Sequence, residues 1–117
     1  MAMDPSQLGA GARDLVMDPE VSRLVSAASV LELAIKHHLG KLPQAAPVLA
    51  DLPQAFVGWA ARELPLTAAQ GALAGGMDWE HRDPFDRILA AQAIMEGALL
   101  VSKDVAFDSA PGVRRIW

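Results

Sequence analysis

The sequence of 117 residues contains no cysteine, which excludes disulfide bonds and thiolate metal sites. This absence fits a protein of the reducing cytoplasm, where we expect the chain to reside. No apolar run approaches the roughly 20 residues that a membrane-spanning helix requires. The opening residues, MAMDPSQLGAG, lack the basic and apolar segments of a signal peptide, so we expect no membrane association.

Basic charge is also scarce, because 10 Lys and Arg residues stand against 14 Asp and Glu residues, a formal net charge of −4. A chain with this balance has no overall basic surface, so any binding of nucleic acid must use a local basic patch. What the sequence does have is apolar residues, 52% of the total, and the length of one ordinary domain. We therefore predict a single folded domain over residues 1–117.

Helical patterns recur along the chain and are clearest in two places. Residues 29–39 begin with a capping-box pattern of Ser29 and Glu32, and residues 84–96 lie between Asp83 and Gly97, a common helix stop. Weaker helical patterns cover residues 5–18, which include two glycines, residues 53–62, and a segment that Thr67 caps and that ends at Gly75 and Gly76.

Short apolar segments that read as strands separate these helices. We predict strands at residues 23–26, 63–66, 98–102 and 113–117. The run ALLVS, residues 98–102, is continuously apolar, which is typical of a strand buried on both faces. Strands that alternate with helices predict an α/β layered fold with a mostly parallel sheet.

The stretch DPFD, residues 83–86, places two acids at the start of a helix. Asp83 is expected at the N-cap, Pro84 at N1 and Asp86 at N3. There both carboxylates face unpaired amides and the positive end of the helix dipole, an interaction worth about 0.3–1 kcal/mol each. Capping by itself therefore accounts for the pattern.

Two more acids are predicted to reach the same edge of the sheet. Glu32 is expected at N3 of a helix that follows a strand, and Asp104 lies two residues after a strand. In a parallel α/β sheet, helix N-termini and the carboxyl ends of strands share one edge, where such folds place their sites. Three carboxylates, with Asp86, would repel one another unless a cation lies among them, and oxygen ligands suit Mg²⁺ or Mn²⁺.

Two segments, VSAASVLELAIKHHLGKL and HRDPFDRILAAQAIMEGALLVSKDVAF, resemble the PIN-domain family, specifically the VapC-type ribonuclease toxins of bacterial toxin–antitoxin pairs. The resemblance runs from about residue 15 to residue 117. It implies a three-layer α/β/α fold around a parallel sheet, with an acidic cluster that binds Mg²⁺ or Mn²⁺ and hydrolyses RNA. Glu32, Asp86 and Asp104 resemble the family's second, third and fourth acids, Asp83 an accessory position, and Ser102 a hydroxyl residue near the metal.

One part of the family pattern has no counterpart. Family members normally begin with an apolar strand that ends in the first catalytic aspartate, whereas Asp4 precedes Pro5 and lies in no apolar strand. The resemblance therefore implies a PIN-like domain that lacks its usual first strand, through either a mis-set start or a degenerate gene. Because that strand is central in the family, we expect its neighbours, the strands at residues 23–26 and 98–102, to pair directly or a homodimer to cover the gap. Residues 8–16 and 48–59 would supply apolar contacts to the dimer.

Two functions follow from the resemblance. The first is a Mg²⁺- or Mn²⁺-dependent endoribonuclease toxin, impaired in this form, whose ion would activate a water for attack on RNA and whose site a cognate antitoxin would block. The second is a non-catalytic PIN-like module that binds antitoxin or RNA without cleavage.

Several cations near these acids have two interpretations each. Arg82 and Arg87 either balance the charge of neighbouring acids or grip a substrate phosphate. Lys36, with His37 and His38, either complements a helix C-terminus or contacts RNA phosphates. His81 could approach the acids from the preceding loop, although a surface position is the simpler interpretation.

Overall fold

Two parallel pairs of short strands form the β-structure of the computed structural model, which describes residues 9–117. Strand β1 (Arg23–Ser26) pairs with β2 (Ala61–Leu64), and β3 (Leu100–Val101) pairs with β4 (Arg115–Ile116). Within the described residues these pairs are separate two-stranded sheets, so β1 and β3 do not pair with each other as one prediction had it. Parallel strands alternating with helices confirm the broad α/β class.

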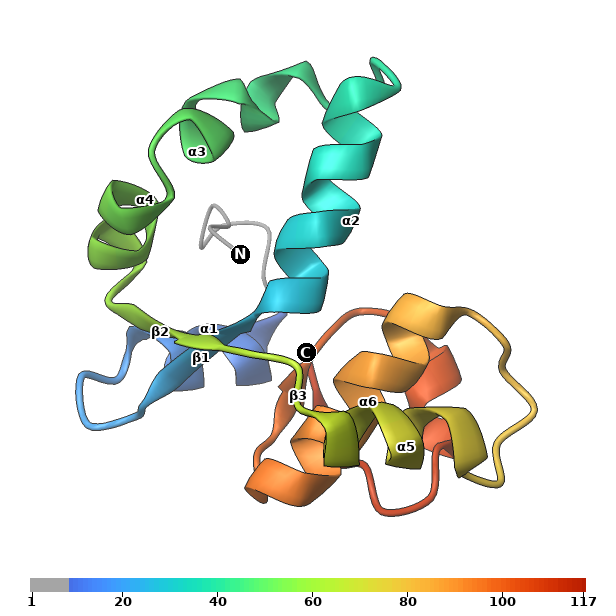
Figure 1. The fold of residues 1–117 in the computed structure, drawn as a ribbon. Helices are drawn as coiled ribbons and strands as arrows, with labels where there is room; N and C mark the ends of the chain where they lie inside the picture. The colour runs from blue at the N-terminus through green and yellow to red at the C-terminus, as the bar shows by residue number, and fades with distance from the viewer. Residues whose placement is uncertain (1–8) are drawn as a thin grey trace.

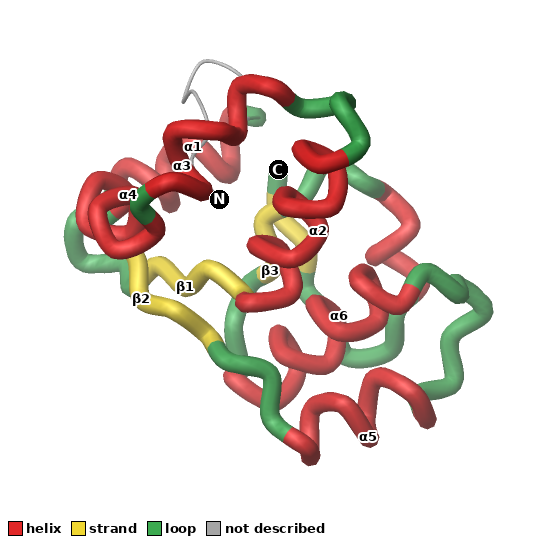
Figure 2. The backbone as a smooth tube through the Cα atoms, turned by 45° about the horizontal axis from the view of Figure 1, so that its top comes forward, coloured by secondary structure: helices red, strands yellow, loops and turns green. Residues whose placement is uncertain are grey.

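The helices lie in two groups around the β1–β2 pair (Figure 1). One group, α2, α3 and α4, forms an arch that starts and ends at this pair, and the other gathers α5, α6 and the C-terminal elements to one side. Figure 2, in which helices are red and strands yellow, shows β1 and β2 side by side. No helix in residues 9–117 has the length and apolar character to cross a membrane. The bounds are α1 (Ala10–Met17), α2 (Ala27–His38), η2 (Pro43–Ala45), α3 (Ala46–Ala50), α4 (Leu52–Trp59), α5 (Ala68–Gly76), α6 (Pro84–Glu96) and η3 (Val105–Ser109), η marking 3₁₀ helices.

Local capping signals set the ends of α5 and α6 as predicted. The Thr67 hydroxyl accepts from the Gln70 amide while the Gln70 side chain accepts from the Thr67 amide, a complete capping box. Helix α6 ends at Gly97, whose φ of 62° lies in the left-handed region that favours glycine. Both helices therefore follow from local sequence.

The start of α2 differs from the prediction. Ser26, the last residue of β1, is the N-cap and accepts from the Ala28 amide at 3.0 Å, so the predicted capping box of Ser29 and Glu32 is wrong. Glu32 is the sixth helical residue, about 7.5 Å along the axis from Ala27, where an N3 residue would be about 3 Å along it. This shift moves Glu32 away from the helix N-terminus.

Strand β1 covers the predicted residues 23–26, and β2 has the predicted length but begins two residues earlier, at Ala61. Strands β3 and β4 are shorter than predicted. Strand β3 covers only two residues, and Val101 within it is 36% exposed, so the prediction of a strand buried on both faces is wrong. Strand β3 has β4 as its single neighbour in the described chain, which leaves its other edge uncovered.

Two glycines that weaken the helical pattern have a packing role in α1. A Cβ at Gly9 would collide with the backbone of Trp117, and one at Gly11 would lie 3.2 Å from the Trp117 carbonyl oxygen. Glycine at these positions lets α1 approach the C-terminal residue closely. The part of the predicted helix before Gly9 lies outside the described residues.

The main core cluster packs against the middle of α6. Its buried residues are Trp79, Ala90, Phe107 and Ala110, with partly buried apolar side chains packed around them. In contrast, α3 and α4 bury no residue. The core cluster therefore packs on α6, the helix that carries Asp86 near its start.

A polar side chain, Gln92, joins the two groups of helices from inside. Gln92 is 1% exposed, and its Oε1 accepts from the Ser26 hydroxyl of β1. Its Nε2 donates to Gln70 Oε1 at 3.1 Å and to the Pro65 carbonyl at 3.3 Å. Each polar atom of this amide thus has a partner, as burial requires.

We expect Gln92→Ala to lower the free energy of unfolding by about 3 kcal/mol, because it leaves a cavity and strands the partners of the amide. Urea denaturation measures the change. The exposed Gln54 of α4 is the matched control, and Gln54→Ala should stay within about 0.5 kcal/mol of the parent chain. Equal effects of the two substitutions would contradict a structural role for Gln92.

Candidate functional site

Asp86 is the least exposed of the three acids of the predicted site. It is the third residue of α6, and its side chain does not cap the helix because Asp83 does so, accepting from the Phe85 and Asp86 amides at 2.9 and 3.2 Å. The Asp86 carboxylate instead bonds through Oδ2 to His81 Nε2, at 2.7 Å. The side chains of His81 and Asp86 are 31% and 21% exposed. Asp86 is therefore half-buried with one oxygen engaged.

Burial raises the pKa of the Asp86 carboxyl above its ordinary value. The negative charges of Asp83 and Asp104 raise the same pKa further, whereas the hydrogen bond from His81 and its charge oppose the shift. Asp86 and Asp104 are thus close enough to repel each other. A cation near them would be attracted by both.

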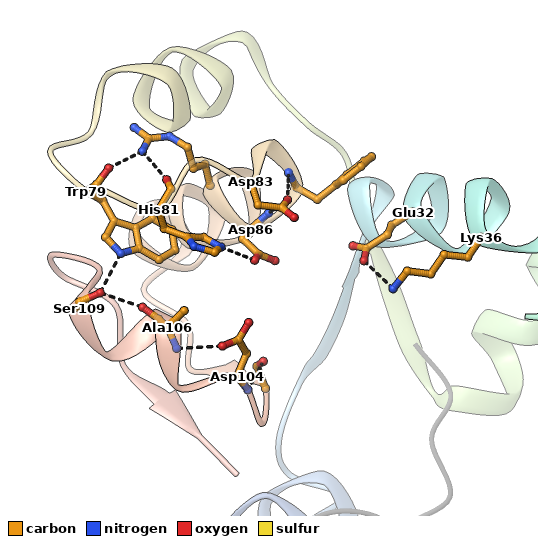
Figure 3. A network of polar contacts seen from close by, with 12 residues as sticks. Glu32, Lys36, Trp79, His81, Asp83, Asp86, Asp104, Ala106 and Ser109 are labelled. Carbon is orange, nitrogen blue, oxygen red and sulfur yellow. Dashed lines mark hydrogen bonds and ion pairs between the residues drawn. The ribbon is translucent and has the colours of Figure 1, made fainter. Parts of the chain in front are cut away.

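Asp104 reaches this region from the other side of the core, where its carboxylate points toward the side of α6 that bears Asp86 (Figure 3). It is the N-cap of η3, and its Oδ1 accepts from the Ala106 amide at 2.9 Å. The hydroxyl of Ser102, the predicted accessory residue, accepts from the Asp104 amide at 3.1 Å. These bonds set the turn that presents Asp104.

Glu32 does not join these acids. Figure 3 shows it apart from them on α2, where its carboxylate bonds Lys36 Nζ at 2.9 Å. Among residues 9–117, no group of three or more His, Asp and Glu side chains is arranged to hold a metal ion. The carboxylate donors have the chemistry that Mg²⁺ prefers, but the three predicted ligands are not assembled.

Arg87 binds backbone carbonyls of its own chain, so its guanidinium is not available for the phosphate contact that was one of its two interpretations. Its guanidinium donates to four backbone carbonyls at 2.6–2.9 Å, which occupies most of its donors. Arg82, in contrast, is exposed with no bond to another residue of the described chain. Lys36 is engaged by Glu32, in a surface pair of the kind worth a few tenths of a kcal/mol. The four carbonyls belong to Ala74, Met77, Trp79 and His81.

His81 is the residue that sequence analysis undervalued. It lies two residues before the N-cap of α6, close enough for its ring to fold back onto the third helical residue. Its place just before the N-cap was the one signal in the sequence that His81 could contact Asp86, because no hydrophobic periodicity marks a loop residue. The structure therefore joins His81 to Asp86, with Asp83 as the helix cap and Asp104 on a separate turn nearby.

Comparisons with known proteins add no family assignment, because no family model matches the sequence and no curated protein matches it. The resemblance to PIN-domain toxins thus rests on its motifs alone.

We expect Arg87→Lys to lower the free energy of unfolding by about 3 kcal/mol, because an ammonium cannot reproduce the fork of donors that serves four carbonyls. The neighbouring Arg82→Lys is the control and should change stability by less than about 0.5 kcal/mol. Chemical denaturation of both variants makes the comparison. If Arg87→Lys behaves like the control, the carbonyl bonds contribute little.

We also predict that Asp86→Asn leaves the melting temperature unchanged or raises it at neutral pH in metal-free buffer. A raised carboxyl pKa means that the folded chain holds this proton more tightly than the unfolded chain. Stability is therefore lost as pH rises through the ordinary and then the raised pKa, and asparagine escapes that loss. The difference from the parent chain should shrink near pH 3, where most carboxyls are protonated. Thermal melts at both pH values, with Asp14→Asn as control, test this. A drop of several degrees at neutral pH would mean that Asp86 is mainly structural.

Proposed function

We propose that this chain is a PIN-like, VapC-type endoribonuclease module, dependent on Mg²⁺ or Mn²⁺, in which Asp86 and Asp104 are the central acids. The observation that carries the proposal is the placement of these two carboxylates, one at the start of α6 and one just after β3, on facing sides of the same region (Figure 3). Carboxyl ends of strands and N-termini of helices are where parallel α/β folds place their sites. The proposal includes the three-layer PIN-like fold as its scaffold.

The residues around the acidic pair have distinct tasks under this proposal. Asp83 caps α6, which leaves Asp86 free of capping, and Ser102 supports the turn at Asp104. The exposed guanidinium of Arg82 is available to an RNA phosphate. Glu32 would complete the acidic set only if it left Lys36 and approached Asp86. Because the described residues do not assemble that set, we assign no catalytic step to the ion.

A non-catalytic PIN-like module is the second candidate, and a specific observation favours it. The described part of the chain holds no group of three metal-binding side chains, and Glu32 is engaged elsewhere. Such a module would bind RNA or an antitoxin without cleavage. Under either candidate, the expected protein partners are a cognate antitoxin and a second copy of the chain.

We expect weak or undetectable cleavage when the 117-residue chain is incubated with single-stranded and structured RNA in Mg²⁺ or Mn²⁺, because two coupled acids make an incomplete metal shell. Any cleavage should disappear with EDTA, with Asp86→Asn and with Asp104→Asn. Asp14→Asn, an exposed change on α1, should leave it intact. Gel analysis of labelled RNA measures cleavage, and calorimetric titration with Mn²⁺ measures metal binding.

The outcomes separate the candidates. Cleavage that Asp86→Asn abolishes supports the ribonuclease, and brisk cleavage of this kind would mean that the acids present suffice. RNA binding with neither cleavage nor Mn²⁺ binding supports the non-catalytic module. Cleavage that survives both acid substitutions would contradict the assignment of these residues.

A further inference from the structure

The contact between His81 and Asp86 is built on both sides of the imidazole. On one side, His81 Nε2 bonds Asp86 Oδ2 at 2.7 Å. On the other, the ring packs on the indole of Trp79, with centroids 4.8 Å apart and planes at 39°. A histidine held by a ring on one face and a carboxylate at its edge has little rotational freedom. Its position is therefore set by the fold.

Trp79 is itself held in the core. It is buried, packs against Phe107 with ring centroids 5.7 Å apart, and donates from Nε1 to the Ser109 hydroxyl at 3.0 Å. The buried indole therefore gives the imidazole a rigid support, unlike a surface loop side chain.

The loop that carries both rings is tied to the helix that carries Asp86. Arg87, the residue after Asp86, donates from one guanidinium nitrogen to the Trp79 carbonyl at 2.7 Å and to the His81 carbonyl at 2.9 Å. The backbone of the loop and the first turn of α6 thus form one unit. The distance between His81 and Asp86 is fixed by these bonds as well as by their own contact.

The same set of contacts continues to Asp104 (Figure 3). The Ser109 hydroxyl, which accepts from Trp79, donates to the Ala106 carbonyl at 2.9 Å. The Ala106 amide donates to Asp104 Oδ1 at 2.9 Å. Asp86 and Asp104 are therefore the two ends of one connected series of side-chain and backbone contacts.

We propose that His81, supported by Trp79, is a positioning residue that holds the Asp86 carboxylate in one orientation through Oδ2 and leaves Oδ1 free for a ligand. Oδ1 makes no hydrogen bond to any residue of the described chain. This role rests on the proposed function, because fixing the orientation of Asp86 matters only if Oδ1 binds a ligand. Partners that orient ligand side chains typically affect metal affinity or activity about 10- to 100-fold.

Two substitutions separate positioning from simple packing. His81→Leu keeps an apolar body against Trp79 but removes the donor, whereas His81→Gln keeps a side-chain amide that can donate to Asp86. Gln44→Leu, a leucine substitution at an exposed polar residue of η2, is the control. The rotamer of Asp86 is measured by NMR in metal-free protein, which needs no activity. Mn²⁺ affinity and the kcat and KM for RNA are measured beside it.

We expect one Asp86 rotamer in the parent chain and in His81→Gln, and an averaged one in His81→Leu. Where Mn²⁺ binding or cleavage is measurable, His81→Leu should weaken affinity and lower kcat about tenfold, with a smaller change in KM, and His81→Gln should recover most of the loss. Gln44→Leu should match the parent chain.

The results also distinguish the two levels of the proposal. A parent chain that neither binds Mn²⁺ nor cleaves RNA would defeat the proposed function, and with it the need for an oriented Oδ1. An unchanged single rotamer in His81→Leu would overturn the positioning role even if the chain is active. If His81→Leu does not fold, His81→Gln decides, because loss of the single rotamer despite its donor would overturn the role.

Discussion

The buried amide of Gln92 is the constraint on which the arrangement of this chain depends. It accepts from Ser26 at the end of β1 and donates to Gln70 of α5 and to the Pro65 carbonyl. Ser26 is also the N-cap of α2, so one side chain of α6 is linked to the start of another helix. Stranding such a buried group costs about 1–3 kcal/mol. The two strand pairs are not joined in one sheet, so the bond from Ser26 to Gln92 is a direct polar link between β1 and α6.

The two acids at the start of α6 have different structural roles. Two acids in the first turn could both serve the helix, but Asp83 takes the exposed amides and Asp86 turns toward His81. Helix capping is therefore supplied by an accessory acid, and the half-buried acid keeps a raised pKa and a free oxygen. Arg87 supports the contact between Asp86 and His81, because its guanidinium donates to carbonyls of the loop that carries His81.

Local signals predicted the elements that depend on local bonds. Thr67, Asp83 and Gly97 marked helix ends correctly because capping involves residues a few positions apart. The bounds of β2, β3 and β4, the buried Gln92 and the carbonyl contacts of Arg87 were not predictable in this way. The partner of Gln92 on β1 is 66 residues away, and nothing in an apolar helical pattern identifies which polar residue faces inward. Of the predicted acids, Glu32 lies apart from Asp86 and pairs with Lys36, whereas His81, which the sequence placed only in a loop, contacts Asp86.

The junction between β1 and α2 keeps Glu32 away from Asp86. The ion pair of Glu32 with Lys36 is too weak to account for this separation. The pair with Lys36 is exposed enough to be worth only a few tenths of a kcal/mol, so it could be broken at little cost. The helix, however, starts immediately after the strand because Ser26 caps it, and Ser26 is held by Gln92. Moving Glu32 toward Asp86 by changing that start would break a buried hydrogen bond. The link that joins the two groups of helices thus also sets how far apart their acids stand.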